Sequence, residues 1–378
     1  MRFDHSKSLL LSGGLFLALF AGGFILSQHK VLWGDEFFTQ KVSIDGPSYM
    51  DILTLHFIEG NKCPLFYLVQ KSFSDLFSYK FPVEQIEGLN VILDRRSQII
   101  MRMPSNVYMS LALALIFYFF TRFFSVFAAI YALSVALVSP LVWMYWVEAR
   151  PYSLWFLLTT IQLLLISCNI ISPKIKTTKS LFLTHVLLAL TVPASILQIS
   201  IALLVLWWKG KYSKKQLALV WVVPVCIGLF YYFIVHAYRT KTFLFFSNLY
   251  DAVMPERLFV YVIYALVAWV LPEKYKKSSR NTFFLPVFLL FLASAVFILS
   301  MDLFTKNFQF GFFSRYLIFL TPADILMFTF ASIDLRRWSR PNPWICMNVS
   351  ILLGGLVLMR GLVTYRAILA SALYLHSP

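Results

Sequence analysis

Charged residues are scarce in this chain of 378 residues. They make up 13% of it, whereas hydrophobic residues make up 60% and aromatic residues 18%. A soluble core cannot use so much apolar surface, so this composition excludes a soluble globular protein. Repeated apolar runs of about 18 to 22 residues favour helices over a barrel. The sequence therefore predicts an all-α polytopic membrane protein, with one transmembrane domain over residues 1–378.

Cysteine and nucleotide-binding motifs are also sparse. The four cysteines are far apart, without a CxxC or Cys/His spacing, and this argues against a disulfide framework and a structural zinc site. Neither a Walker-type loop nor a GxGxxG motif is present, so these two nucleotide-binding motifs give no indication of a nucleotide ligand. The net charge is +16, but the basic residues cluster between apolar runs. That pattern follows from membrane topology and does not favour nucleic acid as a partner.

The apolar runs predict about eleven transmembrane helices. The run 181–208 is divided near Pro193 into a fifth and a sixth span, with a single bent helix as the alternative. With the division, the Lys and Arg clusters all fall on the cytoplasmic side, as does the N-terminus. The expected spans are 9–26, 104–120, 124–142, a fourth that ends near 171, the two spans within 181–208, then 217–236, 258–271, 283–301, 316–333 and 343–359.

The first extracytoplasmic loop covers residues 29–102. Within it, apolar residues recur at helical spacing from Pro64 to Tyr79, which predicts an amphipathic juxtamembrane helix on the membrane surface. The segment 143–152, between the third and fourth spans, is expected to be a short exposed turn.

Two adjacent carboxylates, Asp35 and Glu36, lie where the chain leaves the first span. They belong either to a solvated loop or to a reaction site, because charge at that depth costs free energy. Three arginines, Arg102, Arg150 and Arg315, are expected at the same side of the membrane. Each arginine either snorkels to the interface or binds a phosphate group. Together with the carboxylates, they suggest sugar transfer from a lipid-linked phosphate, with a carboxylate as the base.

Five motifs in order resemble those of the GT-C glycosyltransferases, in particular the family that contains dolichyl-phosphate-mannose protein mannosyltransferases and aminoarabinose transferases. The motifs occur in the expected order and topology over most of the chain. They are Trp33-Gly-Asp35-Glu36, Cys63-Pro-Leu-Phe-Tyr67, Arg102-Met-Pro-Ser105, Ser139-Pro140 with Glu148-Ala-Arg-Pro-Tyr152, and Arg315-Tyr316 with Pro322.

The resemblance implies a role for each matched position. Asp35 would be the catalytic base and Glu36 its neighbour in the acceptor site. The donor phosphate would be bound by Arg102, Arg150, Tyr152, Arg315 and Tyr316. The reaction would invert the anomeric centre.

The resemblance leaves open whether the site binds a divalent cation. Lys62 stands where the family often has a ligand, and a protonated lysine cannot bind a metal. His56 and Glu59 are alternative ligands, or solvated loop residues, and Glu148 belongs to the same acceptor or metal region.

The expected protein is therefore a glycosyltransferase of the bacterial inner membrane with a periplasmic active site. Its partners would be a polyprenyl-phosphate-linked sugar, membrane lipid and an extracytoplasmic glycan, lipopolysaccharide, lipid or, less favoured, protein acceptor. A transporter or flippase of lipid-linked sugars is the alternative, and it predicts internal repeats and deep charges. A third interpretation is a non-catalytic membrane partner.

Overall fold

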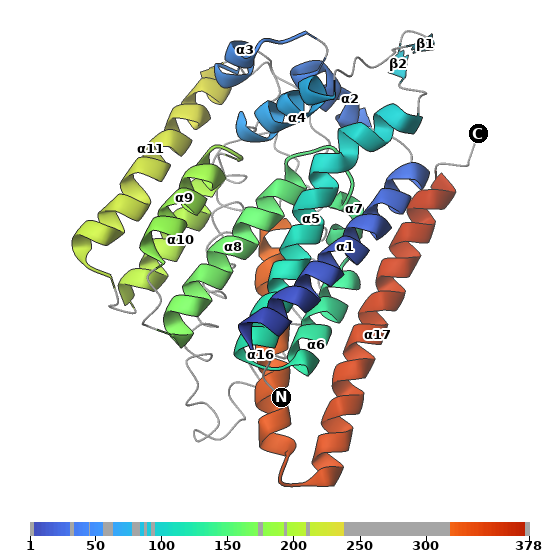
Figure 1. Ribbon diagram of the computed structural model, residues 1–378, viewed down its shortest axis with the longest axis vertical. Helices are drawn as coiled ribbons and strands as arrows, with labels where there is room; N and C mark the ends of the chain where they lie inside the picture. The colour runs from blue at the N-terminus through green and yellow to red at the C-terminus, as the bar shows by residue number, and fades with distance from the viewer. Residues whose placement is uncertain are drawn as a thin grey trace, which may run out of the picture. The chain divides into compact units, whose positions relative to one another are not determined.

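The structure is a computed structural model that describes residues 4–30, 34–44, 46–55, 63–77, 84–86, 89–91, 95–172, 177–192, 195–208, 212–237 and 318–374. Within these ranges the chain is almost wholly helical, apart from a two-stranded antiparallel hairpin (Figure 1). Six of the described helices are long and apolar enough to cross a membrane. The all-α membrane class is thereby confirmed. The spans expected at 258–271 and 283–301 lie outside the described residues, so the number of about eleven stays a prediction.

The chain divides by its contacts into two compact units. The first unit contains residues 1–12, 113–144 and 244–378, and the second contains residues 13–112 and 145–243. Both α1 (His5–His29) and α5 (Arg95–Phe123) contribute residues to each unit. The expected single domain over 1–378 stays a prediction.

In the second unit, α9, α10 and α11 lie side by side, and α8 packs against α9 (Figure 1). The expected break near Pro193 is confirmed by two separate helices. The bounds are Tyr152–Ile171 for α8, Thr178–Ala189 for α9, Ser195–Trp208 for α10 and Lys214–Ala237 for α11.

A chain of buried hydrogen bonds joins these four helices. The carbonyl of Val220 can only accept, so His185 donates to it through Nδ1 at 2.7 Å. Nε2 of His185 then accepts from the amide of Gln162 at 3.0 Å, and Oε1 of Gln162 accepts from Gln198 at 2.7 Å. The indole of Trp155 donates to Gln198 at 3.0 Å. Every one of these bonds joins two different helices, as expected where polar groups hold apolar helices together.

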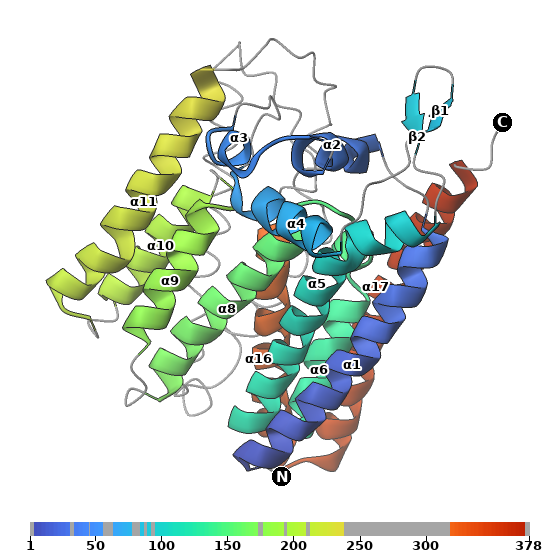
Figure 2. The ribbon, with the colours of Figure 1, turned by 45° about the horizontal axis from the view of Figure 1, so that its top comes forward.

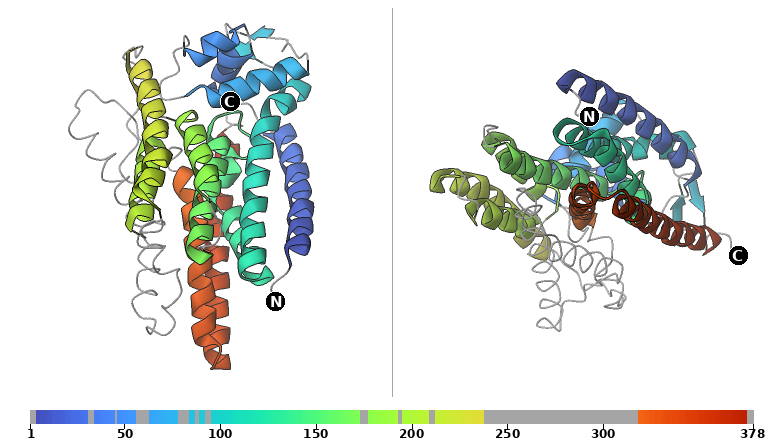
Figure 3. Two further views of the ribbon diagram at one scale, coloured as in Figure 1. Left: turned by 60° about the vertical axis from the view of Figure 1, so that its left-hand side comes forward. Right: turned by 90° about the horizontal axis from the view of Figure 1, so that it is seen from below.

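Three short helices lie at one end of this unit (Figures 2 and 3). They are α2 (Gly34–Ser43), α3 (Tyr49–Leu53) and α4 (Leu65–Leu76). The amphipathic helix expected over 64–79 is confirmed as α4, which buries Phe66 and Tyr67 on one face. The hairpin of β1 (Glu84–Ile86) and β2 (Leu89–Val91) follows.

The first unit contains α6 (Val126–Leu137), α16 (Thr321–Ser339) and α17 (Pro343–Tyr374). α16 packs against both others, and it runs antiparallel to α17 in Figure 1. Phe330 of α16 lies 5.4 Å from Phe120 and 5.5 Å from Phe124, measured between ring centroids. The side chain of Asn342 accepts hydrogen bonds from the amides of Trp344 and Ile345, which caps the start of α17.

Three sequence expectations are wrong in detail. The third span, expected as one helix over 124–142, ends at Leu137, and the short helix α7 (Pro140–Tyr145) follows. Pro140 lacks the N–H that a continuous helix requires. The segment 143–152 was expected to be exposed, but residues 145–152 are buried. They are buried because Trp146 and Ala149 bond to α5 and α2 of the same unit. The second span, expected from Pro104, belongs to a helix that begins at Arg95.

Candidate functional site

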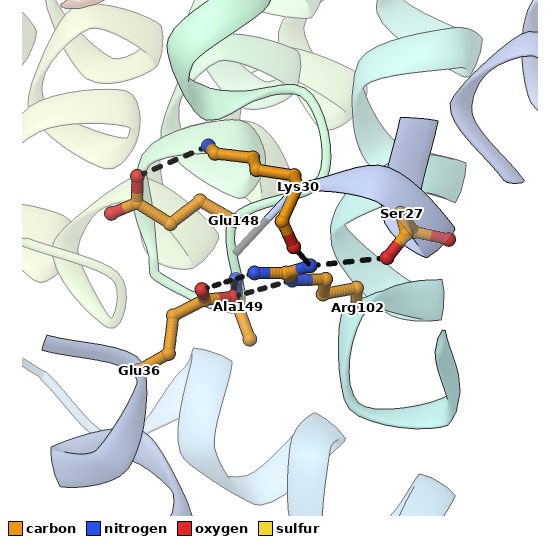
Figure 4. A network of polar contacts seen from close by, with 6 residues as sticks. All are labelled: Ser27, Lys30, Glu36, Arg102, Glu148 and Ala149. Carbon is orange, nitrogen blue, oxygen red and sulfur yellow. Dashed lines mark hydrogen bonds and ion pairs between the residues drawn. The ribbon is translucent and has the colours of Figure 1, made fainter. Parts of the chain in front are cut away.

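The candidate site is built on an ion pair between α2 and α5 that water does not reach. Nε of Arg102 donates to Oε1 of Glu36 at 2.9 Å, and Nη2 donates to Oε2 at 2.6 Å (Figure 4). Both side chains are 0% exposed. Two parallel N–H···O bonds are the strongest geometry available to an arginine and a carboxylate. The pair therefore fixes the orientation of α2 against α5.

The same guanidinium also binds the C-terminal end of α1. Nη1 donates to the carbonyl of Ser27 at 3.1 Å and to that of Lys30 at 2.5 Å. Carbonyl groups in the last turn of a helix lack an intrahelical partner, and the helix dipole attracts a cation there. Four hydrogen bonds thus hold Arg102 in place. The binding of a donor phosphate by Arg102 stays a prediction.

A third segment reaches this ion pair through its backbone. The amide of Ala149 donates to Oε1 of Glu36 at 2.9 Å. The indole of Trp146 in the same segment donates to Asn106 of α5 at 3.1 Å. Asn106 lies one turn beyond Arg102 and donates to the carbonyl of Phe20 in α1 at 2.9 Å. The segment before α8 is therefore fixed at two points.

An outer ion pair lies beside the inner one. Nζ of Lys30 is 3.6 Å from Oε2 of Glu148, and these side chains are 25% and 6% exposed (Figure 4). Glu148 directly precedes Ala149, so its backbone is held in place by the hydrogen bond from the amide of Ala149 to Glu36. Of the charged side chains in this cluster, Lys30 is the one with the largest exposed fraction.

Tyr152 is the first residue of α8, and Arg150 lies two residues before it. Arg150 is buried at 2% exposure, and its Nη1 is 3.5 Å from Oγ1 of Thr39 in α2. The ring of Tyr152 lies against that of Tyr145, with 4.7 Å between the centroids. Arg150 is thus the cation of this segment that points toward α2.

The charge state of Glu36 follows from its neighbours. Burial by itself raises the pKa of this carboxyl, but the hydrogen bonds and the charge of Arg102 outweigh it. The charge of Lys30 and the amide of Ala149 act in the same direction, and the net result is a lowered pKa. Glu36 therefore remains ionised at neutral pH and is a poor proton acceptor.

The structure thus brings together four of the predicted site residues, Glu36, Arg102, Glu148 and Arg150, and Tyr152 follows in the same segment. Asp35 is the second residue of α2, and its side chain lies outside the described part. Five predicted residues also lie outside the described residues, namely His56, Glu59, Lys62, Arg315 and Tyr316.

No group of three potential metal ligands occurs among the residues that the structure describes. Glu148 is the described member of the predicted acceptor or metal region, and it faces the ammonium of Lys30. A cation next to a carboxylate disfavours a divalent metal at the same oxygen. The metal requirement of the protein therefore stays open.

The sequence reasoning missed three contributors. Lys30 follows the first apolar run, on the side of the membrane where Arg102 is expected. A lysine at this position could have been predicted from the sequence as a member of the site. The amide of Ala149 and the carbonyls of Ser27 and Lys30 act through the backbone, which leaves no signature in residue type.

Comparison of the chain with protein-family models gives no match, and comparison with curated proteins gives none either. The resemblance to the GT-C glycosyltransferases is therefore carried by the sequence motifs alone and stays a prediction.

Proposed function

We propose that this chain is a glycosyltransferase that moves a sugar from a polyprenyl phosphate to a hydroxyl group of an extracytoplasmic acceptor. One observation carries the proposal: Glu36 contacts both Arg102 and Ala149. These three residues come from three motifs of the GT-C resemblance, separated by 66 and 113 positions in the chain. Convergence of all three motifs is expected if they serve one site.

The proposal assigns different roles to the two adjacent carboxylates. Glu36 positions α2, because its oxygens accept from Arg102 and Ala149 and its pKa is lowered. Asp35 is the base. A free aspartate has a pKa of about 3.9, so the close approach of the acceptor hydroxyl must supply much of the driving force.

Transfer takes place in one displacement with inversion. The acceptor oxygen gives its proton to Asp35 and forms a bond to the anomeric carbon. The bond from that carbon to the phosphate oxygen breaks, and the electron pair remains on the phosphate. Arg150 stabilises the departing phosphate, and Tyr152 donates a hydrogen bond to it. The GT-C resemblance implies the same role for Arg315 and Tyr316, which lie outside the described residues.

The proposed setting is the bacterial inner membrane, with the N-terminus in the cytoplasm and the site on the periplasmic side. The acceptor class is a surface glycan, lipopolysaccharide or lipid. The distribution of Lys and Arg between the apolar runs supports this orientation.

The test uses the purified full chain in liposomes with a radiolabelled polyprenyl-phosphate sugar and an extract of acceptor lipids and glycans. An enzyme produces labelled acceptor together with free polyprenyl phosphate, and the new linkage has inverted configuration. A flippase instead moves the labelled donor across the bilayer and leaves the sugar–phosphate bond intact. Labelled donor that crosses the bilayer without any product would contradict the proposed function.

A further inference from the structure

The candidate site contains two ion pairs of different character. In the inner pair, Arg102 and Glu36 are 2.6 Å apart and both are 0% exposed. In the outer pair, Lys30 and Glu148 are 3.6 Å apart, and the lysine is 25% exposed. The inner pair is short and shielded from water, whereas the outer pair is longer and open to solvent at the lysine.

The backbones of both outer residues are fixed by the inner pair. The carbonyl of Lys30 accepts from Arg102, and the amide that follows Glu148 donates to Glu36. The side chains of Lys30 and Glu148 can therefore separate while the backbone around them keeps its position. A flexible ammonium at such a fixed point suits an exchange of partners.

We infer that Lys30 and Glu148 form an exchangeable ion pair through which the protein binds a phosphate group. In the absence of ligand, Glu148 balances the charge of Lys30. A phosphate monoester, such as the polyprenyl phosphate that sugar transfer releases, carries more charge and more acceptor oxygens than a carboxylate, so it replaces Glu148 at the ammonium. The choice of a polyprenyl phosphate as the ligand rests on the proposed function.

The inference predicts opposite effects for the two members of the pair. K30A removes the cation that binds the phosphate and weakens binding. E148Q removes the anion that competes for Lys30, so it strengthens binding. A pair that only held the fold together would give the same effect for both variants, because either substitution would break the same contact and weaken binding.

The experiment measures the affinity of the full chain for a fluorescent polyprenyl phosphate in nanodiscs of zwitterionic lipid. We expect about tenfold weaker binding for K30A and about threefold tighter binding for E148Q. The loss of one charge-assisted contact changes a dissociation constant by about one power of ten. The matched control is the pair Lys71–Asp75 of α4, whose charged atoms are 3.5 Å apart. K71A and D75N are expected to leave the affinity unchanged.

Two further arms identify the source of the phosphate. Unlabelled polyprenyl phosphate should compete at low concentration and inorganic phosphate only at high concentration, if the lipid-linked form is the ligand. Loss of binding when phosphatidylglycerol is added would assign the signal to general attraction of anionic lipid and would overturn the inference. If E148Q does not fold, E148D retracts the carboxylate by one methylene and should also tighten binding.

The inference fails if K30A binds as the parent does, or if E148Q and E148D both weaken binding. This outcome is separate from the proposed function, because binding is measured without transfer. Sugar transfer with unaltered affinity in K30A would retain the enzyme and reject the exchangeable pair. Opposite effects on binding without any transfer would retain the pair and reject the enzyme.

Discussion

Replacement of Arg102 by methionine leaves the carboxylate of Glu36 buried without its cation. In the parent protein, Arg102 donates to both oxygens of Glu36, and neither side chain is exposed. In R102M, burial is opposed only by the charge of Lys30 and the amide of Ala149, so the pKa of Glu36 rises. We expect the rise to be large enough for the carboxyl to bind a proton at pH 7. In the unfolded chain it titrates near 4.3, so protonation at pH 7 costs about 4 kcal/mol.

The loss in R102M should depend on pH in a defined direction. Above about pH 4.3, the folded variant holds a proton that the unfolded chain does not, so its free energy of unfolding rises as pH falls, by about 1.4 kcal/mol per pH unit. The parent has a lowered pKa at Glu36 and stays ionised in both states from pH 7 to pH 5. The difference between R102M and the parent should therefore shrink by about 3 kcal/mol over this interval.

E36Q is the matched control because its effect should not depend on pH. It leaves Arg102, which cannot lose its proton, buried beside a neutral amide, at a cost of about 3 kcal/mol. The free energy of unfolding is measured by titration with sodium dodecyl sulfate in mixed micelles at pH 7, 6 and 5. Equal losses at every pH for both variants, or an R102M loss that grows as pH falls, would refute the predicted protonation of Glu36 in R102M.

Two further predictions concern packing within the second unit. A methyl group on Gly23 would lie 1.9 Å from Oδ1 of Asn106, whereas one on Gly22 would meet nothing within 4 Å. G23A should therefore lower the free energy of unfolding by about 1 to 3 kcal/mol, and G22A should leave it unchanged or raise it by up to about 1 kcal/mol. The same titration tests both, and equal behaviour of the two variants would contradict the close approach of α1 and α5. H185A removes two bonds between helices and should cost about 1 to 2 kcal/mol, and the absence of any loss would show that the polar chain from Val220 to Trp155 contributes nothing to stability.

Helix positions were the part of the fold that sequence could predict. The end of α8 at Ile171 and the break near Pro193 follow from apolar length and from proline. α4 follows from the spacing of its apolar residues. These properties are local, so one stretch of sequence contains the information.

The partners within the site could not be predicted in the same way. Arg102 and Glu36 are 66 residues apart, and in the sequence Arg102 is equally compatible with a phosphate ligand and with a carboxylate partner. The burial of residues 145–152 depends on contacts with α2 and α5, and hydropathy does not predict those contacts. Lys30 acts through both its carbonyl and its ammonium, and a lysine after a membrane span ordinarily indicates topology alone.

The most direct test compares sugar transfer by the parent and by D35N, with polyprenyl-phosphate sugar as the donor and with donor binding and unfolding measured in parallel. Removal of the proposed base should lower the rate of transfer by at least about a hundredfold, with donor affinity and the free energy of unfolding unchanged. Transfer by D35N at the rate of the parent would contradict the assignment of Asp35 as the base and, with it, the proposed mechanism.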